Sequence, residues 1–288
     1  MICLKIRIDE MTASELMIKT NHHLIKGGEM TEIQKQNIVR QLTAARTTPE
    51  QAKRFYTGVK FPNNTDENGR QMYPLFFIPP YNNGTKYKTI FNQTPKTHIL
   101  SANMYELEIL RLLHLFASDD PEVKSMIGKT LSRLKTTCFG NEDDGVGECF
   151  DTSLIMLRFL ATVAPYKKEW IQSRIDNYNR HYGNKKRLWF SKWYFWLCLS
   201  ELPFELAKNE IEKYKDEMLN WLSNKSCVMN SDDDKMIHLV LFCILRNALA
   251  KYPEYAYIKD RQPYIKSPEN GRLREKDGRQ YFDMSKES

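Results

Sequence analysis

The segment 141–152 contains several carboxylates and one cysteine, and its residue types and spacing are the most suggestive of chemistry in the sequence. Paired carboxylates can act as general acid and general base, and in glycoside hydrolysis such a pair flanks the bond that breaks. The candidate catalytic residues are therefore Glu142, Asp144, Glu148, Cys149 and Asp151. The alternative, which we favour, is that these acids mark a helix start, where capping and the helix dipole stabilise negative charge.

Cys149 lies in the run Gly-Glu-Cys-Phe at 147–150, where an apolar helix is expected to begin. Backbone amides at such a position stabilise a thiolate. The run resembles the Gly-x-Cys-aromatic start of the central helix in papain-like and transglutaminase-like enzymes, which also need a histidine on a later strand. The later histidines, His181 and His238, lie in segments that are predicted to be helical. A structural role for Cys149 is therefore favoured over a nucleophile.

Lone cations in apolar segments form a second group of candidates. An unpaired buried charge is very costly, so each must pair, bind a ligand or reach solvent. If the apolar helices line a concave surface, these cations form a pocket for an anionic ligand with two histidines beside them. That ligand-binding set is Arg111, His114, Arg158, Lys192, His238 and Arg246. The alternative, which we favour, is that the cations form salt bridges between helices.

Other chemistries find less support in the sequence. The spacing of Arg174 and His181 resembles the R-x6-H pattern of helical RNA-cleaving domains of the HEPN type, although Ile175 stands where a polar residue is usual. No histidine pair has H-E-x-x-H spacing, and the acidic loop at 141–152 lacks the glutamate that an EF-hand requires at position twelve. We predict neither a metal nor a cofactor.

The elements that would position these residues alternate in character from 103 to 258. Four apolar segments each end near a proline, and a more polar helix follows each of them. The prolines recur after 44, 38 and 50 residues, at Pro121, Pro165, Pro203 and Pro253. This irregular period resembles the two-helix repeats of α-solenoids and α/α toroids. Apolar helices would form an inner layer and polar helices an outer one, which brings the loops 136–150, 183–187 and 223–234 to one rim.

Capping patterns predict where several helices begin. Thr31 with Gln34 predicts a helix over 31–46, and Thr48 with Pro49 predicts a second one to about residue 55. Further helices are predicted over 103–117, 121–135, 150–164, 166–182, 187–202 and 204–222, and from 231 onwards. Asn103 with Glu106 is interpreted as the capping box of the first apolar helix, and Ser231 with Asp234 as that of the last.

The segment 58–97 is unlike the rest, because it is rich in proline, Asn-Gly pairs and aromatic residues. Its residue types are those of turns and extended chain, and short strands are predicted at 73–78 and 87–91. The aromatic side chains suggest that this long loop packs on the helical body. After residue 258 the helical pattern ends, and 259–288 is predicted to be an extended tail or a small hairpin.

Composition limits the class of protein. The 288 residues include 41% hydrophobic residues, enough for a large buried core. The net charge of +7 is spread along the chain, with Lys185–Arg187 as the densest cluster, so nucleic acid is an unlikely partner. Six cysteines show no C-x-x-C spacing, and the longest apolar run falls short of the roughly 20 residues of a membrane span. We expect a cytoplasmic protein without a membrane partner.

The predicted fold is mainly α: an α/α hairpin array, solenoid-like or a partial toroid, of about four helical hairpins. Three regions are expected, namely 1–100 with the N-terminal helices and the long loop, 101–258 with the helical repeat, and the tail 259–288. The predicted function is a binding or scaffold protein with a protein or an anionic small ligand as partner. The alternatives are an enzyme for an anionic or carbohydrate substrate at the rim, and a HEPN-like nuclease.

Overall fold

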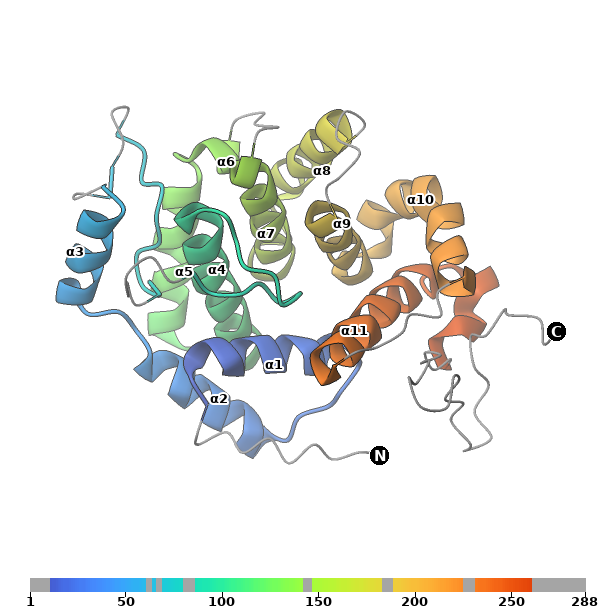
Figure 1. Cartoon of the computed structure of the whole chain (residues 1–288), viewed down its shortest axis with the longest axis horizontal. Helices are drawn as coiled ribbons and strands as arrows, with labels where there is room; N and C mark the ends of the chain where they lie inside the picture. Colours follow the sequence, from blue (N-terminus) through green and yellow to red (C-terminus); the bar gives the residue numbers. More distant parts are fainter. Residues whose placement is uncertain are drawn as a thin grey trace. The chain divides into compact units, whose positions relative to one another are not determined.

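The computed structural model describes residues 11–60, 64–65, 69–79, 86–141, 147–182, 189–224 and 231–260. The protein is mainly helical, as predicted, and the described residues contain no β-strand (Figure 1). The chain divides into two compact units. The first comprises residues 1–24 and 28–191, and the second comprises residues 25–27 and 192–288.

The described residues of the first unit form eight helices, one of which ends at the boundary with the second unit. They are α1 (Ala13–Ile25), α2 (Glu32–Ala44), α3 (Pro49–Gly58), α4 (His98–Ala117), α5 (Pro121–Leu134), α6 (Cys138–Asn141), α7 (Gly147–Val163) and α8 (Lys168–Tyr182). The described residues of the second unit form most of α9 (Trp189–Glu201), together with α10 (Phe204–Asn224), α11 (Asp232–Leu249) and the 3₁₀-helix η2 (Pro253–Asp260).

Several predicted helix starts are confirmed by side-chain caps. Thr31 and Thr48 each accept a hydrogen bond from the backbone three residues on, and the glutamine at that position bonds back to the cap in both cases. Asp120 caps α5 immediately before Pro121, and the Ser231 hydroxyl accepts from Asp234 N at the start of α11. Local chemistry therefore determines these boundaries.

The predicted start of the first apolar helix is wrong. α4 begins at His98 with Thr97 as its cap, so Asn103 and Glu106 lie inside the helix. Both side chains are fully buried there. The spacing of a capping box also places two polar side chains on one helix face, and here it serves tertiary contacts.

The short strands predicted at 73–78 and 87–91 are also wrong. Pro74 and Pro79 lack the N–H that a strand ladder needs, and the four amides between them donate to the side chains of Glu106 and Thr47. In the second segment, Thr89 N donates to Gln93 O over 2.8 Å and closes a turn. Both segments are ordered by turns and side chains instead of by strand pairing.

Two further differences concern the ends of the chain. Helix α1 was not predicted. In the structure, its residues Leu16 and Met17 are buried, and His22 Nε2 lies 2.5 Å from Ile90 O. The predicted tail or hairpin at 259–288 lies outside the described residues, apart from the last residues of η2.

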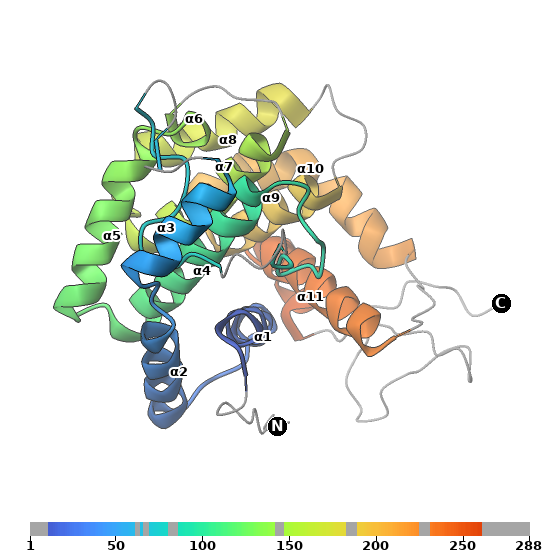
Figure 2. The ribbon, with the colours of Figure 1, turned by 60° about the vertical axis from the view of Figure 1, so that its left-hand side comes forward.

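Helix α4 forms the centre of the first unit, where it packs against α2, α5 and α7 (Figure 1). Every residue from Leu100 to Leu113 is buried, as expected for a helix that is covered on all sides. α3 lies against the N-terminal end of α4 (Figure 2). The rings of Phe55 and His98 meet there edge to face, with 6.0 Å between their centres. This central helix therefore carries the polar residues that organise the unit.

The second unit has an aromatic core. The ring of Trp193 lies 5.0 Å from that of Trp196 and 5.0 Å from that of Trp221, edge to face in both pairs. α10 packs against α11, and Tyr252 OH donates to Lys208 O over 2.7 Å. In the part of the chain that the structure describes, no helix is both long and apolar enough to cross a bilayer.

Candidate functional site

The carboxylate of Glu148 holds the start of α4. Its two oxygens accept hydrogen bonds from Lys96 N, from Thr97 N at 2.8 Å and from the Thr97 hydroxyl. The Thr97 amide is one of the donors that a helix N-terminus leaves without a partner inside the helix. Both oxygens of this candidate catalytic residue are thus engaged in joining α7 to α4.

The other rim candidates have separate contacts. Cys149 Sγ lies 3.5 Å from Cys138 Sγ, and Asp151 accepts a hydrogen bond from the Ser191 hydroxyl. Glu142 and Asp144 lie outside the described residues. Glu148 thus contacts the start of α4, whereas Asp151 contacts Ser191.

The inner cations of the first unit form a buried cluster around one carboxylate. Arg158 donates to both oxygens of Glu108 at 2.9 Å, and Arg111 Nη1 lies 3.9 Å from the same carboxylate. Arg111 also donates to Asn21 Oδ1 and to the Thr162 hydroxyl, at 3.0 and 3.1 Å. The Arg158–Glu108 pair is a salt bridge between α7 and α4, whereas Arg111 and Glu108 both belong to α4.

The inner cations of the second unit have other partners. Lys192 Nζ lies 2.8 Å from Glu217 Oε1 and 5.0 Å from the centre of the Trp196 ring. Arg246 Nη2 donates to Lys26 O over 3.4 Å. Because two of the four cations belong to each unit, neither unit contains the four-cation pocket by itself.

The candidate histidines also pack on neighbouring groups. His238 lies 5.3 Å from the Trp221 ring, between ring centres, and His181 lies 6.1 Å from Phe150. Burial lowers the pKa of His114. Arg174, the other half of the nuclease pattern, is buried and donates to Phe139 O over 3.1 Å, so its guanidinium links α8 to α6.

A polar network that the sequence analysis missed connects α4 to residues 69–79, which we call the strap. Glu106 Oε2 accepts from the backbone amides of Leu75, Phe76 and Phe77, at 2.8, 2.6 and 3.3 Å. Its other oxygen accepts from Arg133 Nη2 of α5 at 3.2 Å, and both side chains are fully buried. One carboxylate thus satisfies three amides that have no strand partner.

Arg133 extends the network to both neighbouring elements. Its Nη1 donates to Asn103 Oδ1 at 2.9 Å and to Gln71 O at 3.5 Å, while Asn103 Nδ2 donates to Met72 O at 3.0 Å. Burial lowers the pKa of Arg133, and the charge of Glu106 opposes this effect. Two acids in an otherwise apolar helix were the signal that could have revealed the network, because buried charges require partners.

Tyrosines complete the attachment of the strap. Tyr56 OH donates a hydrogen bond to Pro74 O over 2.6 Å. The Asn64 side chain accepts from Tyr73 N and donates to Tyr73 O, both at 2.9 Å. Burial raises the pKa of Tyr56 and of Tyr73 to about 12 in each case. Both phenols are therefore neutral at physiological pH and act as packing and hydrogen-bonding groups.

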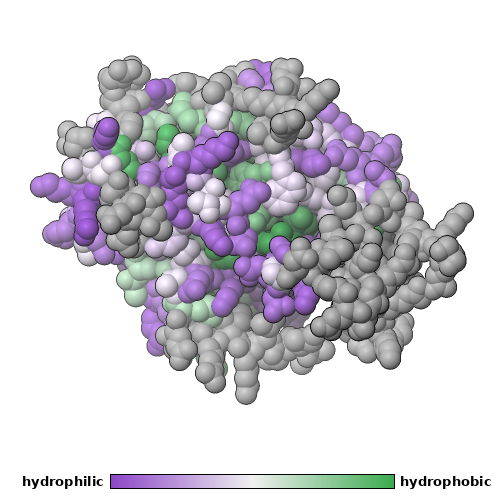
Figure 3. Space-filling view, in the orientation of Figure 1, coloured by the Kyte–Doolittle hydropathy of each residue, from purple (hydrophilic) through white to green (hydrophobic). Residues whose placement is uncertain are grey.

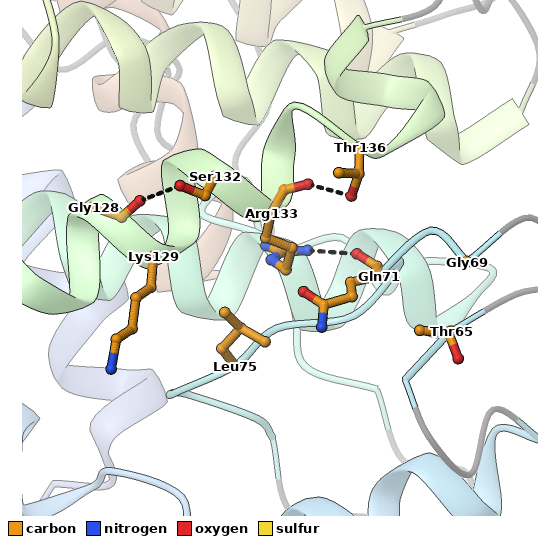
Figure 4. Close-up of a pocket in the computed structure, with 9 residues that line it drawn as sticks. All are labelled: Thr65, Gly69, Gln71, Leu75, Gly128, Lys129, Ser132, Arg133 and Thr136. Carbon is orange, nitrogen blue, oxygen red and sulfur yellow. Dashed lines mark hydrogen bonds between the residues drawn. The ribbon is translucent and has the colours of Figure 1, made fainter.

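Beside this network lies an open hollow of about 500 Å³ between α5 and the strap (Figure 4). Its walls come from two turns of α5 and from the strap and its flank. They are formed by Thr65, Gly69, Gln71, Leu75, Gly128, Lys129, Ser132, Arg133 and Thr136. The side chains of Thr65, Gln71 and Lys129 have no hydrogen-bond or ion-pair partner within the described part of the chain. The hollow thus offers a hydroxyl, an amide and an ammonium group to a ligand.

Among the described residues, no group of three His, Cys, Asp or Glu side chains is placed to hold a metal ion. Comparison of the chain with protein-family models, with curated proteins and with solved structures finds no match.

Proposed function

We propose that the protein is a helical binding or scaffold protein, and that the hollow beside α5 takes a short acidic segment of a partner protein. The observation that carries the proposal is the set of polar groups around the hollow that have no described partner. Lys129 supplies positive charge, while Gln71 and Thr65 supply groups that can donate and accept hydrogen bonds. A binding surface needs such groups, because every polar group that a ligand buries must find a partner.

The size of the hollow suits a peptide. Its lining follows α5 from Gly128 to Arg133 and continues to Thr136 in the turn after the helix, a span of about 12 Å at the rise of about 1.5 Å per residue. An extended chain covers about 3.3 Å per residue, so about four residues would fit. A ligand of this length reaches Lys129 as well as the strap.

We propose that the helices that carry this surface form a hairpin array. α4 with α5 and α7 with α8 are consecutive packed pairs in the first unit, and the buried helices α4 and α7 pack on each other. In the second unit, α9 with α10 and α11 with η2 follow the same order along the chain. These pairings support a solenoid-like or partial-toroid arrangement, which typically offers extended surfaces for partners.

An enzyme at the rim and a nuclease centred on Arg174 gain less support. Glu148 holds the start of α4, and Arg174 is buried against a carbonyl of α6. These side chains would have to leave structural contacts to act on a substrate. The surface visible in Figure 3 is largely hydrophilic, with small hydrophobic areas between, so a polar partner suits it better than an apolar one.

The test is a binding screen of short extended peptides by fluorescence anisotropy, in which acidic and neutral versions of each sequence are compared. We expect the acidic versions to bind, and Lys129→Glu to weaken them by about ten-fold or more, which corresponds to about 1.4 kcal/mol. The matched control is Lys124→Glu, which changes the charge of another exposed lysine of α5 outside the hollow. Equal losses in both variants, or no preference for acidic peptides, would contradict the proposal.

A further inference from the structure

Two cysteines of the first unit are in contact. Cys138 begins α6 and Cys149 lies in the first turn of α7, and their sulfur atoms are 3.5 Å apart, with the Cys138 thiol as donor. The two side chains are not joined by a disulfide. A disulfide bond is about 2.0 Å long, so the sulfurs need to approach by only about 1.5 Å to form one.

The backbone on both sides of this pair is held in place. After Cys138, the carbonyls of Phe139 and Gly140 accept hydrogen bonds from Arg174 and Trp170 of α8, at 3.1 and 2.6 Å. Gly140 packs so closely that a Cβ there would lie 1.9 Å from Leu134 O. Next to Cys149, Glu148 is bonded to the start of α4. The two thiols therefore meet through the fixed positions of α6 and α7.

The two thiols differ in their access to solvent. Cys138 is buried, whereas Cys149 is partly exposed. Cys149 also lies in the first turn of α7, and its sulfur accepts the Cys138 S–H. An oxidant from solution thus meets Cys149 first and finds Cys138 behind it.

We propose that Cys138 and Cys149 form a reversible dithiol–disulfide site that is oxidised by hydroperoxides. The Cys149 thiolate attacks one oxygen of the hydroperoxide ROOH, the O–O bond breaks, and the alcohol ROH leaves after taking up a proton. Cys149 is then a sulfenic acid. The Cys138 thiol attacks that sulfur, the S–S bond forms, the S–O bond breaks and water leaves. Overall, the two thiols lose two hydrogens and the peroxide is reduced to ROH and water.

The sequence allows a direct test on the full-length protein. Trypsin releases residues 136–158 as one peptide, because no lysine or arginine lies between Lys135 and Arg158, and this peptide contains Cys138 and Cys149 as its only cysteines. After hydrogen peroxide and alkylation, we expect the peptide to lose both alkyl groups together and to become lighter by two hydrogens. Cleavage at the acidic residues between the cysteines should then leave the two halves joined until a dithiol reductant is added.

Variants distinguish this site from general thiol oxidation. In Cys138→Ser, we expect Cys149 to stop at the sulfenic acid, which dimedone traps, and in Cys149→Ser we expect Cys138 to remain alkylatable. The buried thiol of Cys243 serves as the internal reference, and the pair should react at least about ten-fold faster than it does. Oxidation of one cysteine alone in the wild type, a link between two chains, or reaction no faster than Cys243 would overturn the proposal.

Discussion

Glu106 and Glu108 lie two residues apart on α4 and are both buried, yet they organise different parts of the first unit. Glu106 holds a non-helical segment, through three amides of the strap and Arg133 of α5. Glu108 holds helix to helix, through Arg158 of α7 and the nearby Arg111. Because residues two positions apart lie on nearly opposite faces of a helix, the two acids serve separate neighbours.

The difference shows what a buried carboxylate can replace. Around Glu106 it takes the place of a strand ladder, since the strap has no strand among the described residues to bond with. Around Glu108 it places a negative charge beside two buried guanidinium groups. The first role is local to the strap, whereas the second concerns the packing of the two central helices.

We expect the largest effect from Glu108→Ala. The substitution leaves Arg158 fully buried without its carboxylate, and such losses cost about 3–5 kcal/mol of unfolding free energy. Urea denaturation would measure this loss. The double substitution Glu108→Met with Arg158→Leu should recover most of it, because an apolar pair needs no neutralisation. If the double variant is as unstable as the single one, the ion pair is not the reason for the loss.

A smaller and more local effect is expected from Glu106→Gln. The amide retains an oxygen for the strap but loses the charge opposite Arg133, which costs about 1–3 kcal/mol. Hydrogen exchange should increase at the amides of Leu75, Phe76 and Phe77, while the amides of α7 keep their protection. Glu108→Gln is the matched control and should not expose the strap selectively. Uniform loss of protection in both variants would remove the distinction between the two acids.

The smallest effect concerns pH and the two ends of α4. Burial lowers the pKa of His98 and of His114 below the ordinary value of 6.5. Below that value the unfolded chain takes up protons before the folded one, so these histidines make stability fall as the pH decreases toward their folded pKa values. For each histidine, the change in unfolding free energy per pH unit should stay well below the one-proton limit of about 1.4 kcal/mol.

Unfolding free energies at pH 7.5 and 5.5 would test this expectation. His114→Gln should reduce the difference between the two pH values, and His98→Gln should do the same at the other end of the helix. If neither variant changes the difference, the pH dependence originates elsewhere in the chain, and the ends of α4 do not contribute to it.

The sequence predicted those parts of the fold that depend on neighbouring residues. The caps at Thr31, Thr48 and Ser231 act over three residues, and all three were predicted. The start of α4 was missed although Thr97 caps it locally, because the spacing of Asn103 and Glu106 was interpreted as the capping box. The strands were mispredicted because the partner of the strap amides is a distant side chain of α4.

The candidate sites depended even more on distant contacts. Arg158 of α7 pairs with Glu108 of α4, and the residue types alone could not identify this partner, because it lies fifty positions away in the chain. Lys129 and Gln71 carry no motif, and only folding places them beside one hollow. Residue types indicate what chemistry a side chain can perform, whereas its partners are determined by packing.

Gly140 also limits which sequences this fold accepts. Any side chain there would collide with the carbonyl of Leu134, so position 140 should admit glycine alone. Gly128, on the wall of the hollow, has open space within 4 Å of the point where a Cβ would lie, and it should tolerate alanine. A distant relative that has diverged at most positions would thus keep the glycine that follows Cys-Phe, whereas the glycine at position 128 could be replaced by another residue. This contrast offers a way to recognise such a relative.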